Sequence, residues 1–149
     1  MTWTILVCGD RHRSDDGAAL VAAERLGDLP AQVGIRVVGQ LEPDDLVAAT
    51  ATGSCLVLDA VRGVAPGGVL ALPLADMVAG GPPAASSHAL PLPTVVALAE
   101  ALGAHLDRAT FVGIGGEQFG LGEGLSPAVA GGLEAYLATI TRTVATGTI

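Results

Sequence analysis

Short apolar runs, each followed by a glycine or an aspartate, are the feature that most constrains the fold of this chain. Residues 5–8 (Ile-Leu-Val-Cys) end at Gly9, and residues 55–58 (Cys-Leu-Val-Leu) end at Asp59. Such runs do not alternate with polar residues, which is typical of strands buried on both faces of a parallel sheet. Residues 35–38, 69–72 and 110–114 are expected to form three further strands, with residues 69–72 paired locally.

Segments with helical spacing lie between these runs. The first extends from Asp16 to a stop at Gly27, the second opens at Pro43, and the third opens at Pro93 and stops at Gly103. The third is expected to bury Val95, Leu98, Ala99 and Leu102. Ser126-Pro127 opens the last helix, whose apolar stripe is Val129, Leu133, Tyr136, Leu137, Ile140 and Val144. The sequence therefore predicts one domain, residues 1–149, with a three-layer α/β/α sandwich fold and a mostly parallel sheet of about five strands.

The charge balance excludes several classes of partner. The chain contains no lysine, and its 7 arginines stand against 15 acidic residues, for a net charge of −8. Nucleic acids and anionic membranes require a basic face, so we expect neither as a partner. The N-terminus lacks a targeting pattern, and the uncharged stretch 77–99 contains four prolines, which favours a loop and a helix over a membrane span. Cys8 and Cys55 are expected to be buried thiols in a reducing cytoplasm.

The carboxyl ends of parallel strands are where such sheets bind ligands. Four segments are predicted there: residues 10–16, Asp59, residues 86–88 with His88, and residues 115–118. Each has a purely structural alternative. Asp15 or Asp16 could cap the first helix, Asp59 could accept backbone N–H bonds in a turn, and His88 could be a solvated loop residue.

Taken together, two carboxylates and an imidazole at one edge of a sheet predict an open metal site. That set of ligands suits zinc or nickel and leaves positions for solvent or substrate. A lysine-dependent phosphate loop and a Gly-x-Ser-x-Gly nucleophile elbow are both absent from the sequence. Cys8 is expected to be an unreactive core thiol, and the glycines between 113 and 124 to permit close backbone packing beside the site.

At these residues the chain resembles the hydrogenase maturation proteases. Gly9-Asp10, followed by Asp15-Asp16-Gly17, resembles that family's opening Gly-Asn-x-x-x-x-Asp-Asp/Glu-Gly signature. Four further segments match in order along the chain: Gln40 to Pro43, Leu58-Asp59-Ala60-Val61, Ser87-His88 with Pro91, and Gly122 to Pro127.

The resemblance implies an endopeptidase that removes the C-terminal extension of a nickel–iron hydrogenase large-subunit precursor after nickel insertion. It assigns the catalytic and nickel-recognising roles to Asp16, Asp59 and His88. The nickel is then supplied by the precursor, no organic cofactor is needed, and the protein is expected to be a cytoplasmic monomer. Either Asp16 or Asp59 acts as general base for water, or the metal polarises the scissile carbonyl.

Two departures from the family pattern suggest alternatives. Val7 stands where the family commonly has glycine, and Asp10 where it has asparagine. A chain altered in this way could be a non-cleaving checkpoint chaperone that binds the immature large subunit. A third hypothesis is an unrelated hydrolase with permanently bound zinc.

Overall fold

A five-stranded mixed sheet forms the centre of the computed structural model, which describes residues 2–77 and 90–147. Its strands are β1 (Trp3–Cys8), β2 (Val33–Gly39), β3 (Ser54–Val61), β4 (Val69–Pro73) and β5 (Ala109–Gly115). Their order across the sheet is β2-β1-β3-β5-β4. All neighbouring strands are parallel except β4 and β5, which run antiparallel.

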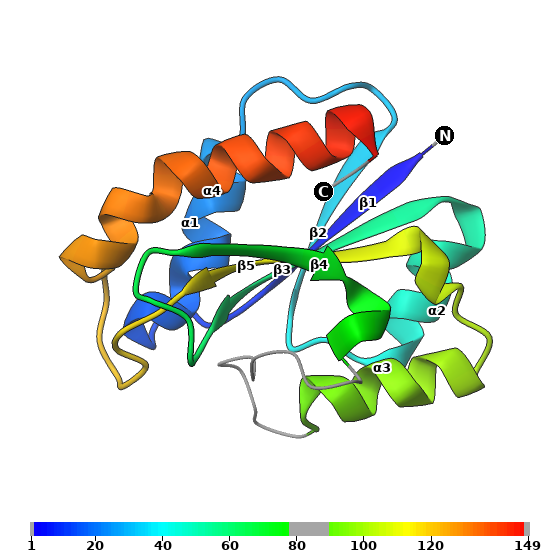
Figure 1. Cartoon of the computed structure of the whole chain (residues 1–149), viewed down its shortest axis with the longest axis horizontal. Helices are drawn as coiled ribbons and strands as arrows, with labels where there is room; N and C mark the ends of the chain where they lie inside the picture. Colours follow the sequence, from blue (N-terminus) through cyan, green and yellow to red (C-terminus); the bar gives the residue numbers. More distant parts are fainter. Residues whose placement is uncertain (1, 78–89, 148–149) are drawn as a thin grey trace.

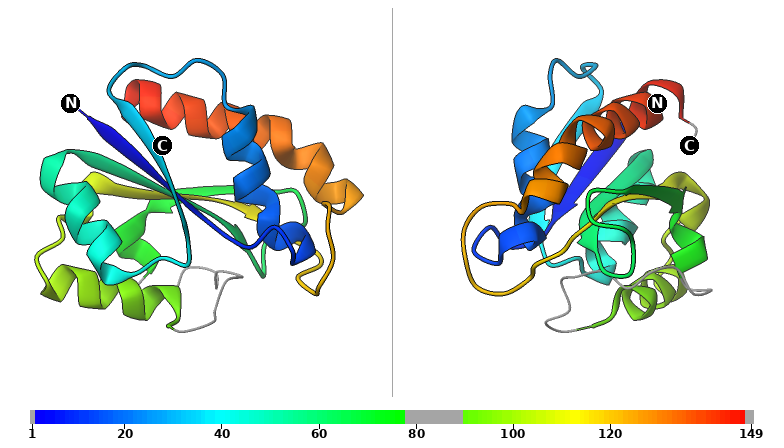
Figure 2. Two further views of the ribbon diagram at one scale, coloured as in Figure 1. Left: turned by 180° about the vertical axis from the view of Figure 1, so that it is seen from behind. Right: turned by 60° about the vertical axis from the view of Figure 1, so that its left-hand side comes forward.

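Four α-helices cover the two faces of the sheet. They are α1 (Ala18–Arg25), α2 (Pro43–Thr52), α3 (Leu92–Ala101) and α4 (Pro127–Thr146). Helices α1 and α4 lie on one face, and α2 and α3 on the other (Figures 1 and 2). Short 3₁₀ helices are η1 (Ser14–Gly17), η2 (Leu74–Met77) and η3 (Leu106–Arg108). The predicted three-layer sandwich with a mostly parallel sheet is therefore confirmed.

Each face of the sheet has its own apolar core, as the uninterrupted strand sequences require. In β1, Leu6 and Cys8 pack toward α2 and α3, whereas Ile5 and Val7 pack toward α1 and α4. All four are at most 1% exposed. Val7, which stands where the hydrogenase maturation proteases commonly have glycine, therefore packs in the core between the sheet and helices α1 and α4.

Three sequence expectations about these elements were wrong. Strand β4 pairs with the much later β5 at the sheet edge and not with a local partner. Strand β3 does not end at Asp59 but continues to Val61. Helix α3 exposes Leu98 (43%) and Leu102 (60%) and buries Val96 instead, because Leu92, Val95, Val96 and Ala99 form its core-facing stripe.

The starts of α2 and α4 were predicted correctly. Pro43 lies in the first turn of α2, where the backbone N–H of Glu42 donates to Asp45 Oδ2 at 2.9 Å. Helix α4 has Ser126 as its N-cap and Pro127 at its first position, and it ends at Gly147 in a left-handed conformation. Within residues 2–77 and 90–147, no helix combines the length and apolarity that crossing a membrane requires.

Candidate functional site

Asp16 lies in η1, the single 3₁₀ turn between β1 and α1. It is 2% exposed, and its Oδ2 accepts a hydrogen bond from the backbone N–H of Asp10 at 3.0 Å. The N-cap of α1 is Gly17, without a side-chain cap. The alternative in which Asp15 or Asp16 caps this helix is therefore wrong, and the structure instead buries two adjacent carboxylates.

Asp59 projects from the last part of β3 and is 3% exposed. Its Oδ1 accepts the backbone N–H of Ala60 at 2.9 Å. Asp59 thus accepts a backbone N–H bond, as the structural alternative supposed, but it does so within a strand, where it is paired with Gly113 of β5, and not in a turn. A side chain on a central strand is positioned more rigidly than one on a loop.

Gly9 is the point of contact between the two carboxylate-bearing segments. It follows β1 with a φ of +121°, and a Cβ built there would lie 2.1 Å from the backbone oxygen of Asp16 and 3.9 Å from Asp59 Oδ1. Only glycine permits both this backbone conformation and this approach. The structure thus brings Asp16 and Asp59 to the same edge of the sheet, as the sequence predicted.

The negative charges of the aspartates affect the pKa values of two buried neighbours, Cys8 and Tyr136. Burial raises the pKa of the Cys8 thiol, and the negative charge of Asp59 and, more weakly, of Asp16 raises it further. Burial also raises the pKa of Tyr136, again with a contribution from Asp59. The Tyr136 hydroxyl donates to the backbone oxygen of Val112 at 2.9 Å. The negative potential at this edge favours a bound cation, and the protonated thiol agrees with the expected unreactive Cys8.

A pocket opens beside Asp59 on the α3 face of the sheet. Apolar side chains make up most of its wall, and its lining residues are Cys8, Gln40, Leu41, Val57, Asp59, Leu90, Leu92, Val95 and Phe111. A second pocket shares Gln40, Leu41 and Leu90 with the first and extends to Glu42 and Pro43. Residues 40–43 therefore form the wall of a depression that leads to Asp59.

His88, the third predicted ligand, lies outside the described residues, as do the neighbouring Ser86 and Ser87. Among residues 2–77 and 90–147, no three histidine, cysteine, aspartate or glutamate side chains are grouped so as to hold a metal ion. The described part of the chain thus places two carboxylates, those of Asp16 and Asp59, at one edge of the sheet.

Asp15 has a role that sequence reasoning missed. Its buried carboxylate accepts hydrogen bonds from the backbone N–H groups of Glu117 and Gln118, both at 2.9 Å, and from both the N–H (2.7 Å) and the hydroxyl (2.8 Å) of Ser126. Burial raises the pKa of Asp15, but these hydrogen bonds outweigh that effect and hold the pKa below its ordinary value. The predicted N-cap Ser126 uses its hydroxyl for Asp15 and not for α4.

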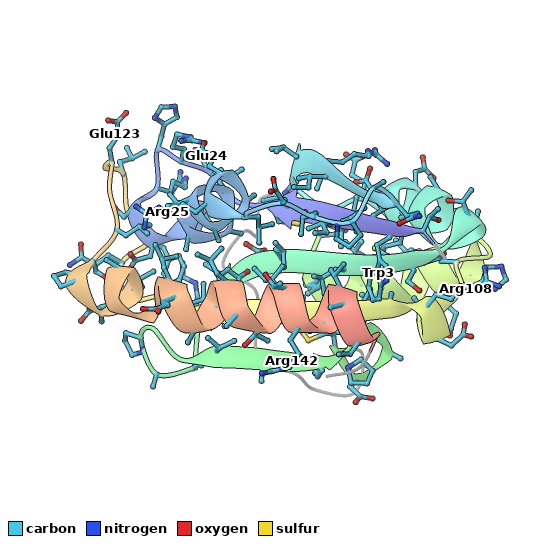
Figure 3. The ribbon with its side chains drawn as sticks, turned by 90° about the horizontal axis from the view of Figure 1, so that it is seen from above. Trp3, Glu24, Arg25, Arg108, Glu123 and Arg142 are labelled. Carbon is cyan, nitrogen blue, oxygen red and sulfur yellow. The ribbon has the colours of Figure 1, made fainter. Side chains whose placement is uncertain are left out.

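The loop between β5 and α4, here called the rim loop (residues 116–126), is tied to the loop after β1. Ser14 donates its backbone N–H to Gly122 at 2.8 Å and its hydroxyl to Gly120 at 3.0 Å, and Gly122 in turn donates to His12. In Figure 3, Glu123 marks the rim loop at the opposite end of the molecule from Trp3 and Arg108. The expected close packing is found at Gly113, Gly115, Gly116 and Gly122, whereas a Cβ at Gly120 or Gly124 would meet no atom within 4 Å.

Asp10 stands where the hydrogenase maturation proteases commonly have asparagine, and its carboxylate bonds within its own loop. Its Oδ1 accepts the backbone N–H of His12 at 2.8 Å, a bond that an asparagine oxygen could accept equally well. His12 is 72% exposed in its side chain, and its Nδ1 lies 3.5 Å from Glu123 Oε1. His12 is therefore a surface residue.

Comparison with known proteins depends on structure and not on sequence. No family model matches this chain, and no curated protein matches it. Solved structures do match over nearly its full length. The hydrogenase maturating endopeptidase HybD from E. coli is 22% identical, with 99% of this chain and 94% of that chain covered and a TM-score of 0.79.

Two further structures agree with that match. A solution structure of an endopeptidase from Escherichia coli is 21% identical, with coverage of 100% and 95% and a TM-score of 0.81. The [NiFe] hydrogenase maturation protease HycI from Thermococcus kodakarensis KOD1 is 25% identical, with coverage of 97% and 93% and a TM-score of 0.68.

Proposed function

We propose that this chain, which has the fold of the hydrogenase maturation proteases along its whole length, is itself a processing endopeptidase. Its substrate is the precursor of a nickel–iron hydrogenase large subunit, from which it removes a C-terminal extension after nickel insertion. The observation that carries this proposal is the meeting of Asp16 and Asp59, two buried aspartates from separate segments, at the carboxyl edge of a sheet with this fold.

Nickel enters this proposal as part of the substrate. Carboxylate oxygens and an imidazole suit a divalent ion of this kind, and the negative potential around Asp59 and Asp16 favours a cation. Asp16, Asp59 and His88 engage nickel that the precursor already holds. This contact places the scissile peptide against the site, so an empty precursor binds less well and is not cut.

Hydrolysis then requires a base for the attacking water or polarisation of the scissile carbonyl. In this proposal either Asp16 or Asp59 serves as the base, or the substrate's nickel would supply the polarisation. The depression bordered by residues 40–43 adjoins the small pocket that Asp59 lines. We assign the residues that flank the cleavage point to this depression.

Intact-mass analysis tests the proposal. A nickel-loaded precursor and a nickel-free precursor are each incubated with the protein. Loss of a C-terminal peptide from the loaded sample alone is expected, and Asp16→Asn and Asp59→Asn are expected to abolish it. Binding of both precursors without any mass change would instead favour the non-cleaving checkpoint chaperone. Zinc retained stoichiometrically through dialysis would favour the unrelated metallohydrolase.

A further inference from the structure

The carboxylate of Asp15 is bonded entirely to residues of the rim loop in the contacts that the structure shows. It is fully buried and faces the rim loop, where four donated hydrogen bonds from Glu117, Gln118 and Ser126 surround its two oxygens. The backbone N–H of Asp15 also donates to the carbonyl of Gln118 at 2.9 Å. A carboxylate satisfied in this way acts on its surroundings through structure rather than by contact with a reacting atom.

The same rim loop is fastened to the strand that carries Asp59. The backbone N–H of Gly116 donates to the carbonyl of Val61 at 2.9 Å, two residues beyond Asp59. Gly116 lies close to the ring of Phe119, which would have to move to admit a Cβ, because the Cβ would lie 2.3 Å from that ring. A continuous series of bonds therefore links the turn that holds Asp16, through Asp15 and the rim loop, to the end of β3.

Asp16 depends on this link because η1 is only one short turn. Its four residues cannot set the direction of a side chain as a long helix does, and Asp16 is covalently adjacent to Asp15. Gly9 provides a close steric contact with the same turn, but it fixes only one side of it. The other side is held by Asp15.

We propose that Asp15 is a positioning residue that fixes the Asp16 carboxylate relative to Asp59. This inference rests on the proposed endopeptidase function for its effect on rate, and on the structure alone for its effect on geometry. The nearly isosteric variant Asp15→Asn removes the charge and turns one acceptor into a donor that faces backbone N–H groups. The turn that holds Asp16 then shifts while the core persists.

Two experiments on the full chain test the proposal, with Thr50→Val as the matched control. Thr50 is fully buried, donates to Leu46 and accepts from the backbone of His105, and lies on α2. The N–H resonances of Asp10 and Ala60 report on Asp16 and Asp59, to whose side chains they donate. Asp15→Asn is expected to shift the Asp10 resonance strongly and Ala60 little, and Thr50→Val to shift neither. An unchanged Asp10 resonance in Asp15→Asn would overturn the proposal.

The second experiment measures cleavage of nickel-loaded precursor. Asp15→Asn is expected to lower kcat by roughly 10- to 100-fold and also to raise KM, because a displaced Asp16 serves the reaction less well and loses its contact with the substrate's nickel. Thr50→Val keeps the wild-type kcat. Ser126→Ala, which removes one of the four bonds and folds even if Asp15→Asn does not, lowers kcat by a few-fold. Wild-type kcat in both site variants would overturn the inference, whereas absence of cleavage by the wild-type protein would overturn the proposed function instead.

Discussion

Replacement of Gly9 by alanine tests the geometry of the site most severely. The new Cβ would lie 2.1 Å from the backbone oxygen of Asp16, so one of the two segments must retreat by roughly 1 Å before the contact becomes tolerable. The backbone at a φ of +121° adds strain of about 1–3 kcal/mol, and relief of the overlap costs about 1–3 kcal/mol more. We therefore expect Gly9→Ala to lose about 2–6 kcal/mol of unfolding free energy.

Gly63→Ala is the matched control for this variant. Gly63 also has a positive φ, of +80°, but a Cβ there would meet no atom within 4 Å. Its loss is therefore limited to the conformational strain of about 1–2 kcal/mol. Urea denaturation followed by circular dichroism measures both values. Equal losses in the two variants would refute the claim that Gly9 lies in close contact with the turn that carries Asp16.

Three further predictions concern buried groups. Hydrogen bonds hold the pKa of Asp15 below its ordinary value of 3.8, so as pH falls this carboxylate is protonated in the unfolded chain before it is protonated in the folded chain. The free energy of unfolding should therefore decline from just above pH 3.8 downward. Asp15→Asn should flatten this part of a profile of urea stability against pH. Burial raises the pKa of Cys55 to about 12 and that of Cys8 well above its ordinary value, so neither thiol should react with iodoacetamide at pH 8 until urea unfolds the chain; rapid native labelling of either would contradict this burial. Tyr136→Phe removes the hydrogen bond to Val112 in the core and should cost about 1 kcal/mol in urea denaturation, and an unchanged midpoint would show that the bond contributes nothing.

The sequence was most informative where local chemistry alone decides structure. Uninterrupted apolar runs at residues 5–8 and 55–58 can only be strands covered on both faces, and the sheet that follows places Asp16 and Asp59 at one edge. The proline and serine signals at Pro43 and Ser126 located two helix starts for the same reason.

Features that depend on distant partners were not predictable. Asp15 is bonded to Ser126, 111 residues later, and nothing in a local Asp-Asp-Gly pattern distinguishes such an anchor from a helix cap. Likewise, the partner of β4 is set by sheet assembly, and the buried stripe of α3 by the exact rotation of that helix on the sheet. His88 stays a prediction, since it lies outside the described residues.

Cleavage as a function of nickel content tests the central claim most directly. Precursor preparations of graded nickel occupancy are incubated with the protein to completion, and intact mass gives the fraction that has lost its C-terminal extension. We expect this fraction to equal the nickel-loaded fraction at every occupancy. Complete cleavage of nickel-free precursor, or no cleavage at full occupancy, would contradict it.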